Sequence, residues 1–400
     1  MKECNGSKNS DVLWRSIAFS FVPALSSSGF VQRYFGNVGV ILYFVFCVFF
    51  FAVFIRIAER SRSVWEENRR LSYVLIGASL AFLSAVFLVV YPIANAGVIG
   101  GGSDRDDALN IAVQALLNGH YPYYIRTYLG NPISPLPGGI ILAMPFVVIL
   151  GNSAYQNLVW IMVYLLILRA YYRHLFLAGA VFILSFLAFP MALNELIAGG
   201  DLLANSIAVL LLVVMADRYF ARMPTSVQIA FAVFSGIVFS WRANFMMIYP
   251  LIATIMWRRA DLKSVLLYSS TAFFAFLAVT LPFWVYDLSG FTPLHAYSKL
   301  GSFDALVPGV GSLIPVFSFL LACVLSLHVR SSAALLRSCA IIQLLPVLAG
   351  AVFTSISDRH LDLVFILSYG LLFPLFWITG GYEQLESFEA ERMEAELALG

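Results

Sequence analysis

Residues 71–94, LSYVLIGASLAFLSAVFLVVYPIA, contain no Asp, Glu, Lys or Arg. A helix needs roughly 20 mostly apolar residues to cross the hydrocarbon core of a bilayer, so this stretch predicts a membrane-spanning helix. No water is present in that core, and backbone groups must therefore bond within each helix. The expected fold is a bundle of such helices.

The composition of the whole chain supports the same fold class. Of the 400 residues, 61% are hydrophobic and 12% are charged, and the mean hydropathy is +0.87, whereas a soluble domain carries about 25% charged residues. We predict an all-α, polytopic transmembrane helical bundle of about 10 to 13 spans. The clearest candidate spans are residues 36–57, 71–94, 175–193, 202–216, 264–286, 313–327, 338–353 and 361–379, with shorter ones at 157–168, 227–241 and 245–257.

The chain is predicted to be a single integral membrane domain, 1–400. Residues 1–35 form an N-terminal segment that either lies in the membrane interface or makes an irregular first span, and they lack the order of a cleaved signal peptide. Residues 95–133 and 288–312 are predicted loops, and 382–400 form an acidic tail. The net charge of +2 does not favour nucleic acid as a partner, and the four scattered cysteines do not favour a disulfide or metal site.

Arginine and lysine in short loops predict the orientation. Five arginines lie between the first two clear spans, at positions 56, 60, 62, 69 and 70, which makes that loop cytoplasmic. Alternation then places residues 99–131, 194–200, 287–311, 355–360 and the turn at Arg242 on the external face. An odd number of crossings must separate the first of these loops from Arg169, so the proline-rich stretch 133–150 is predicted to be re-entrant or interfacial.

The first external loop contains SDRDDALNIAVQALLNG, residues 103–119, in which apolar residues recur at helical spacing. This pattern predicts an amphipathic helix on the external surface. Ser103 and Asp106 have the spacing of a capping box. In one interpretation the three carboxylates only start this helix. In the other, Asp104, Asp106 and Asp107 supply a general base or hold a metal at the membrane surface.

Arginine is the natural partner for a charged leaving group, because a guanidinium binds phosphate with two hydrogen bonds and stays charged. Arg126 and Arg242 are therefore the candidates for binding a donor phosphate, and Arg105 is a weaker one.

Further candidates for contacting a substrate come from polar residues in the external loops. GHYPYYIRTYLGNPISPLPGG, residues 119–139, has tyrosines whose rings and hydroxyls suit a binding loop, although an aromatic belt at the interface is the alternative. Ionisable groups at membrane depth are costly and usually line cavities. The predicted substrate-contacting residues are His120, Tyr121, Tyr123, Glu195, Asp201, Asn244, His295 and Lys299.

These motifs resemble the GT-C superfamily, the multi-spanning glycosyltransferases that take a sugar from a polyprenyl-phosphate carrier, above all the branch of polyprenyl-phosphate-mannose and arabinofuranose transferases. The resemblance is carried by the Asp-containing loop, LLNGHYPY, PISPLPGGIILAMP, NELIAGGDLLANSIAVLLL and SWRANFMMIYPLI, between about residues 104 and 286. The chain departs from that branch in having DRDD where a lone Asp followed by an aromatic residue is common. It also lacks a large external C-terminal domain.

The resemblance implies an inverting hexosyl- or pentosyltransferase of cell-envelope glycan biosynthesis. It would lie in the cytoplasmic membrane with its site on the periplasmic or extracellular face. A polyprenyl-phosphate-linked sugar would be the donor and a glycan or glycolipid the acceptor. The family's acidic residue would fall on Asp104, with Asp106 or Asp107 as rivals, and its basic residue on Arg242. The spacing of the acidic residues does not itself imply a cofactor, and a divalent cation, Mg²⁺ or Mn²⁺, is compatible with the site.

Two other functions remain open at this point. One is a flippase or transporter of a lipid-linked sugar, a class in which internal repeats are common, although none is visible in this chain. The other is a polysaccharide polymerase or ligase.

Overall fold

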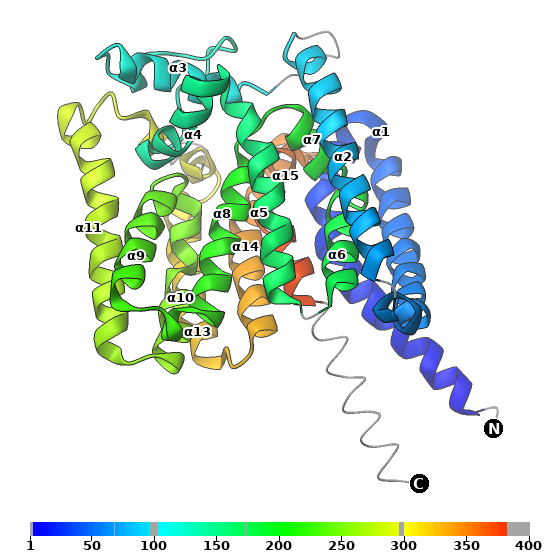
Figure 1. Ribbon diagram of the computed structural model, residues 1–400. Coiled ribbons are helices and arrows are strands. Elements are labelled where there is room, and N and C mark those ends of the chain that lie inside the picture. Colours follow the sequence, from blue (N-terminus) through cyan, green and yellow to red (C-terminus); the bar gives the residue numbers. More distant parts are fainter. Residues whose placement is uncertain (1–2, 68, 97–102, 173, 296–299, 382–400) are drawn as a thin grey trace. The chain divides into compact units, whose positions relative to one another are not determined.

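The computed structural model describes residues 3–67, 69–96, 103–172, 174–295 and 300–381 (Figure 1). These residues are helical, and among them the only β-pairing is one isolated antiparallel bridge between Arg126 and Pro132. The chain divides into two compact units. The first unit comprises Met1–Ser79, Leu168–Leu193 and Ser331–Gly400, and the second comprises Leu80–Ile167 and Asn194–Arg330. The predicted all-α fold class is therefore confirmed for the described residues.

The first unit is built on α1 (Glu3–Glu67), which is two helices joined at Gly36, where φ is 66° and ψ is −171°. Only glycine adopts this backbone conformation readily. The part of α1 before the joint is largely buried from Phe19 to Val31, and it packs against α15 (Val364–Tyr369). Close approach is permitted by Gly29, because a side chain there would meet the backbone oxygen of Leu363. The segment is thus a packed part of its unit.

Six helices among the described residues are long and apolar enough to cross a membrane, which identifies the chain as a membrane protein. They are Phe19–Phe54, Arg70–Asn95, Ser153–Tyr171, Leu262–Tyr286, Val310–His328 and Ser332–Asp358. The bent pair Leu175–Leu187 and Pro190–Ile197 raises the count to seven if it makes one span. Shorter apolar helices, Pro137–Leu150 and Thr225–Phe239, are not included in this count, and the number of 10 to 13 spans stays a prediction.

The count is lower because several apolar runs do not form one straight helix. The predicted span 175–193 is broken into α6 (Leu175–Leu187) and α7 (Pro190–Ile197), with a bend of 78°. Proline cannot supply the backbone N–H that a continuous helix needs, and Pro190 begins the second piece. The predicted span 361–379 is likewise interrupted after α15.

The second unit contains one helix that is almost entirely buried. At its core is α8 (Leu202–Arg218), whose stretch between Asp201 and Asp217 carries no charge and is almost entirely buried. Because protein rather than lipid covers this run, its apolar character does not indicate a lipid-facing span. It packs against α9 (Thr225–Phe239) and α10 (Tyr249–Arg259). The unit also contains α11 (Leu262–Tyr286), α13 (Val310–His328) and most of α5 (Gln156–Tyr171).

Two helices of this unit form one end of it. Figure 1 shows α3 (Arg105–Leu117) lying crosswise above α4 (Pro137–Leu150), and the two pack together. With 14 residues, α4 is about 21 Å long and shorter than a bilayer core. This length agrees with the expectation that residues 133–150 do not cross the membrane.

The contact between α9 and α11 generates a prediction about stability. A Cβ at Gly236 would collide with the backbone oxygen of Ala272, so Gly236→Ala must push the helices apart and should destabilise the protein by about 1–3 kcal/mol. Gly77, in α2 (Arg69–Asn95), has open space around it. Gly77→Ala should stabilise by about 0.5–1 kcal/mol through helix propensity. Thermal unfolding in detergent compares the two, and equal effects would contradict the close packing.

Candidate functional site

The start of α3 differs from the predicted capping box. Asp104 is the residue before the first helical turn, and it makes no side-chain cap bond. The Ser103 hydroxyl accepts a hydrogen bond from the Arg105 N–H at 3.3 Å, while Asp106 points into the protein and does not return to the backbone of Ser103. The three acids of DRDD thus have three different environments. The capping box was a wrong prediction, because the burial of Asp106 competes with capping.

Asp104 is held by a tight hairpin. Its Oδ2 accepts hydrogen bonds from the Thr127 hydroxyl at 2.5 Å and from the Asn131 side-chain amide at 2.8 Å. The hairpin closes on itself, since the Thr127 N–H donates to the Asn131 oxygen at 2.9 Å. Gly130 has a φ of 76°, a left-handed conformation that suits glycine. The Asp104 carboxylate is half-buried and has a fixed orientation.

The same hairpin carries Arg126, the residue before Thr127. Its side chain is exposed, and its Nη1 donates to the Gly130 oxygen at 3.0 Å. Asp107 also reaches this hairpin, because its Oδ2 accepts the N–H of Tyr128 at 3.0 Å. The structure therefore brings together two of the three predicted acids and one of the two predicted phosphate-binding arginines.

Asp106 is buried, with 1% of its surface exposed. Its Oδ2 accepts a hydrogen bond from the Tyr91 hydroxyl at 2.6 Å, and its Oδ1 has no partner among the described residues. Burial penalises the charged form and raises the pKa of Asp106 to about 6, although the Tyr91 hydroxyl opposes that rise. This carboxyl group fastens α3 to α2.

Glu195 and Asp201 form buried ion pairs, and their predicted contact with substrate stays a prediction. Nη1 of Arg105 donates to both carboxylate oxygens of Glu195, at 2.7 and 2.8 Å. The Leu202 N–H adds a third hydrogen bond to Glu195, at 3.1 Å. Gly200 allows this arrangement, because a side chain there would collide with the Glu195 carboxylate. The pair ties the first turn of α3 to α7.

Arg242 binds Asp201 with the two-pronged geometry typical of guanidinium and carboxylate. Its Nη2 donates to Oδ1 at 2.6 Å and its Nε donates to Oδ2 at 3.2 Å. The Trp241 indole N–H donates to the same Oδ2 at 2.9 Å, and Nη1 of Arg242 reaches the Ser134 hydroxyl at 3.2 Å. Only 13% of the Arg242 side chain and none of the Asp201 side chain is exposed. The positive charge of Arg242, which the sequence analysis assigns to binding a donor phosphate, is balanced within the protein by the Asp201 carboxylate.

The predicted tyrosines dock the loop against its surroundings. The Tyr121 hydroxyl donates to the Phe283 oxygen at 2.8 Å, and the buried Tyr123 hydroxyl donates to the Pro135 oxygen at 3.1 Å. Burial raises the pKa of Tyr121 to about 12 and that of Tyr123 well above its usual value, so both hydroxyls remain protonated donors.

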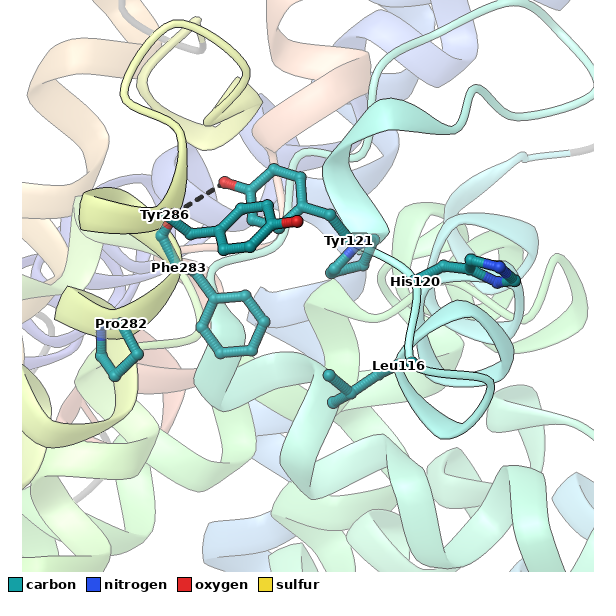
Figure 2. A pocket seen from close by; sticks show the side chains of 8 residues that line it. Leu116, His120, Tyr121, Pro282, Phe283 and Tyr286 are labelled. Atoms are coloured by element: carbon teal, nitrogen blue, oxygen red, sulfur yellow. Dashed lines mark hydrogen bonds between the residues drawn. The ribbon is translucent and has the colours of Figure 1, made fainter.

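The other predicted contact residues lie apart from Asp104 or outside the description. His120 is exposed and lines a cavity with Tyr121 at the far end of α3 (Figure 2). Asn244 is half-buried in the 3-10 turn Ala243–Ile248 after Arg242. The side chain of His295, the whole of Lys299 and the acidic tail 382–400 fall outside the described residues.

Sequence reasoning missed the residues that hold the site together. Thr127, Asn131, Ser134, Trp241 and Tyr91 each donate to a functional carboxylate or accept from Arg242. Their partners lie between 15 and 108 positions away in the chain. No local spacing could have shown these pairs.

Among the described residues, one group of acidic and histidine side chains is close enough to share a metal ion. It is Asp358, His360 and Asp362, whose ligand atoms lie within 4.8 Å of one another. This group belongs to the first unit, whereas the carboxylates of DRDD belong to the second and do not form such a group. The compatibility of the DRDD loop with Mg²⁺ or Mn²⁺ stays a prediction.

Comparison of the chain with protein-family models, with curated proteins and with solved structures gives no match. The resemblance to the GT-C superfamily therefore rests on the sequence motifs and stays a prediction.

The raised pKa of Asp106 predicts a pH dependence of stability. The folded protein binds this proton more tightly than the unfolded chain, so the associated stability is fully present below pH 3.8 and is lost as the pH rises through about 6. Asp106→Asn removes that loss and should stabilise the protein at pH 7 by up to about 3 kcal/mol relative to wild type. Melting temperatures between pH 4 and 8 measure the difference. Tyr91→Phe should move the upper end of this window to higher pH, and identical curves for all three proteins would refute the assignment.

The Arg242–Asp201 pair predicts a large asymmetry between two arginines. Arg242→Met leaves the Asp201 carboxylate buried without its partner and should cost about 3–5 kcal/mol of unfolding free energy. The exposed Arg126 provides the matched control, and Arg126→Met should change stability by less than about 0.5 kcal/mol. Adding Asp201→Asn to Arg242→Met should restore part of the loss. Chemical unfolding in detergent tests this set, and similar costs at both arginines would show that the buried pair is not structural.

Proposed function

We propose that the protein is a GT-C-type membrane glycosyltransferase. It transfers a sugar from a polyprenyl-phosphate donor to a hydroxyl group of a glycan or glycolipid acceptor. The observation that carries this proposal is the Asp104 carboxylate, half-buried and fixed by Thr127 and Asn131, on a hairpin that also presents the exposed Arg126.

The proposed reaction is a single displacement. Asp104 removes the proton from the acceptor hydroxyl, and the acceptor oxygen forms a bond to the anomeric carbon as the bond from that carbon to the phosphate oxygen breaks. The bonding electrons leave with the lipid phosphate, whose negative charge Arg126 neutralises. Attack opposite the leaving group inverts the anomeric configuration.

The environments of the three acids favour Asp104 as the base. A base must be reachable by the acceptor, and Asp106 is buried with one oxygen bonded to Tyr91. Asp107 is partly accessible but accepts the N–H of Tyr128. Asp104 combines partial exposure with two side-chain donors that set its direction. We therefore assign Asp104 as the base, with Asp107 as its rival.

In this proposal Arg126 and Arg242 have different roles. Arg242 is balanced by Asp201 and donates to Ser134, so it positions the start of the proline-rich segment. The Arg126 side chain is exposed and donates to the backbone oxygen of Gly130, which leaves its positive charge available for a phosphate.

The location of charge favours transfer over transport. The paired charges of the second unit occur at α3, at α7 and at the two ends of α8. The middle of α8 is apolar, whereas a transporter places polar groups near the midplane of the bilayer. The proposal includes the cytoplasmic membrane as the location and its external face as the side of the site.

A transfer assay with the purified protein tests this function. A panel of polyprenyl-phosphate hexoses and pentoses is supplied as donors, with lipid-extracted glycans as acceptors. Asp104→Asn should lower kcat at least about 100-fold, the usual contribution of a general base. Arg126→Gln should weaken donor binding and raise KM.

The neighbouring acids serve as matched controls. Asp107→Asn and Asp106→Asn should keep transfer within about tenfold of wild type, because neither removes the proposed base. Full activity in all three variants would remove the base from this loop. A wild-type protein that moves the intact lipid-linked sugar across liposomes without transferring it would replace the proposal with the flippase.

A further inference from the structure

A cavity of about 230 Å³ lies between the far end of α3 and the last turn of α11. One wall comes from Leu116, His120 and Tyr121, and the other from Pro282, Phe283 and Tyr286 (Figure 2). Rings and aliphatic side chains make up nearly all of this lining. The surface is therefore suited to an apolar ligand.

The two walls are fixed to each other by contacts beside the cavity. The Tyr121 hydroxyl donates to the Phe283 oxygen at 2.8 Å, as the dashed line in Figure 2 marks. The rings of Tyr121 and Tyr286 stack with centroids 4.9 Å apart. The Tyr124 hydroxyl donates to Oδ2 of Asp287 at 2.9 Å. These contacts keep the cavity formed without a ligand, as is common for binding sites.

The cavity adjoins surface that is suited to lipid. One wall belongs to α11, which is long and apolar enough to cross a membrane. Beside the cavity, Val285 is 71% exposed and Trp284 is 41% exposed. Leu117, next to the lining residue Leu116 in the chain, is 57% exposed. Aromatic residues at the end of a span are typical of the boundary between lipid tails and headgroups.

We propose that this cavity binds one acyl chain of a bilayer phospholipid. Selecting a rare lipid by its headgroup requires fixed polar or charged groups. Here the Tyr121 hydroxyl is already bonded to the backbone, and no carboxylate, lysine or arginine is among the described lining residues. Acyl chains of the bilayer are present at very high local concentration, so mass action fills a weak apolar site with them.

The bound chain fastens the end of α3 to the end of α11 at the membrane boundary. It fills the space that the Tyr121 and Tyr124 hydrogen bonds hold open. This role does not depend on glycosyl transfer.

Photo-crosslinking in nanodiscs tests the proposal. The full-length protein is reconstituted with phosphatidylcholine that carries a diazirine in the middle of one acyl chain, and crosslinked peptides are mapped by mass spectrometry. The wild type should crosslink at residues 116–122 and 282–286. Leu116→Trp fills the cavity and should reduce the yield at residues 116–122 at least fivefold relative to the exposed Phe273 and Phe274 of α11.

Leu117→Trp is the matched control, since the neighbouring side chain is exposed and does not line the cavity. It should leave the crosslinking ratio unchanged. Phe283→Trp, on the opposite wall, is a second filling variant, used if Leu116→Trp is not monodisperse. An unchanged ratio in the filled variant would overturn the proposal. Loss of the wild-type crosslink on adding a few mole per cent of polyprenyl phosphate would also overturn it, by identifying an isoprenoid chain as the occupant.

Discussion

The ion pair between Arg242 and Asp201 is the interaction on which the second unit depends most. Asp201 is fully buried at the start of α8, and a buried charge is tolerated only when partners replace its lost hydration. Arg242 and Trp241 provide three hydrogen bonds to it. Since Arg242 also donates to Ser134, one carboxylate organises the start of the central helix, the turn after α9 and the segment before α4.

Glu195 repeats this arrangement six positions earlier in the chain. It pairs with Arg105 and so fixes the first turn of α3. Both acids belong to the segment NELIAGGD, residues 194–201, whose two glycines allow the chain to fold back: Gly199 has a φ of 69°, and Gly200 leaves room for the Glu195 carboxylate. A short polar segment thus positions α3. Asp104 lies directly before that helix, and its direction depends on a carboxylate that no substrate needs to touch.

The sequence was most informative where a pattern is local. The spacing of apolar residues in 103–119 predicted α3, which buries Leu109, Ala112 and Val113. Length and hydropathy were less informative for the spans. An apolar run can be covered by protein, as α8 is, or by lipid, and the sequence pattern is the same in both cases. The sequence shows a proline at position 190. The 78° bend between α6 and α7 also depends on how these two helices pack, which the sequence does not show. For this reason the apolar runs of the sequence and the helices of the structure do not correspond one to one.

The site was harder to predict because charge pairing is not local. Read separately, Asp201, Glu195 and Arg242 each resemble a substrate contact, since ionisable groups at membrane depth usually have a function. The structure shows that Asp201 pairs with Arg242 and that Glu195 pairs with Arg105. The partners lie 41 and 90 positions apart in the chain. Because Arg242 is paired with Asp201, Arg126 becomes the stronger candidate for binding a donor phosphate. From the sequence alone, the two arginines were equal candidates for this role.

The loop that contains α3 combines two chemical environments. The helix has 13 residues and is about 20 Å long. Carboxylates lie at its start, where Asp104 and Asp107 are tied to the hairpin at Thr127 and Tyr128. Its last turn carries Leu116 and Leu117 beside an aromatic cavity. Carboxylates favour water and aliphatic side chains favour an apolar environment, so we expect α3 to lie at one depth at the membrane boundary. Within the protein, the pair of Arg105 and Glu195 holds the start of α3 and with it the Asp104 carboxylate.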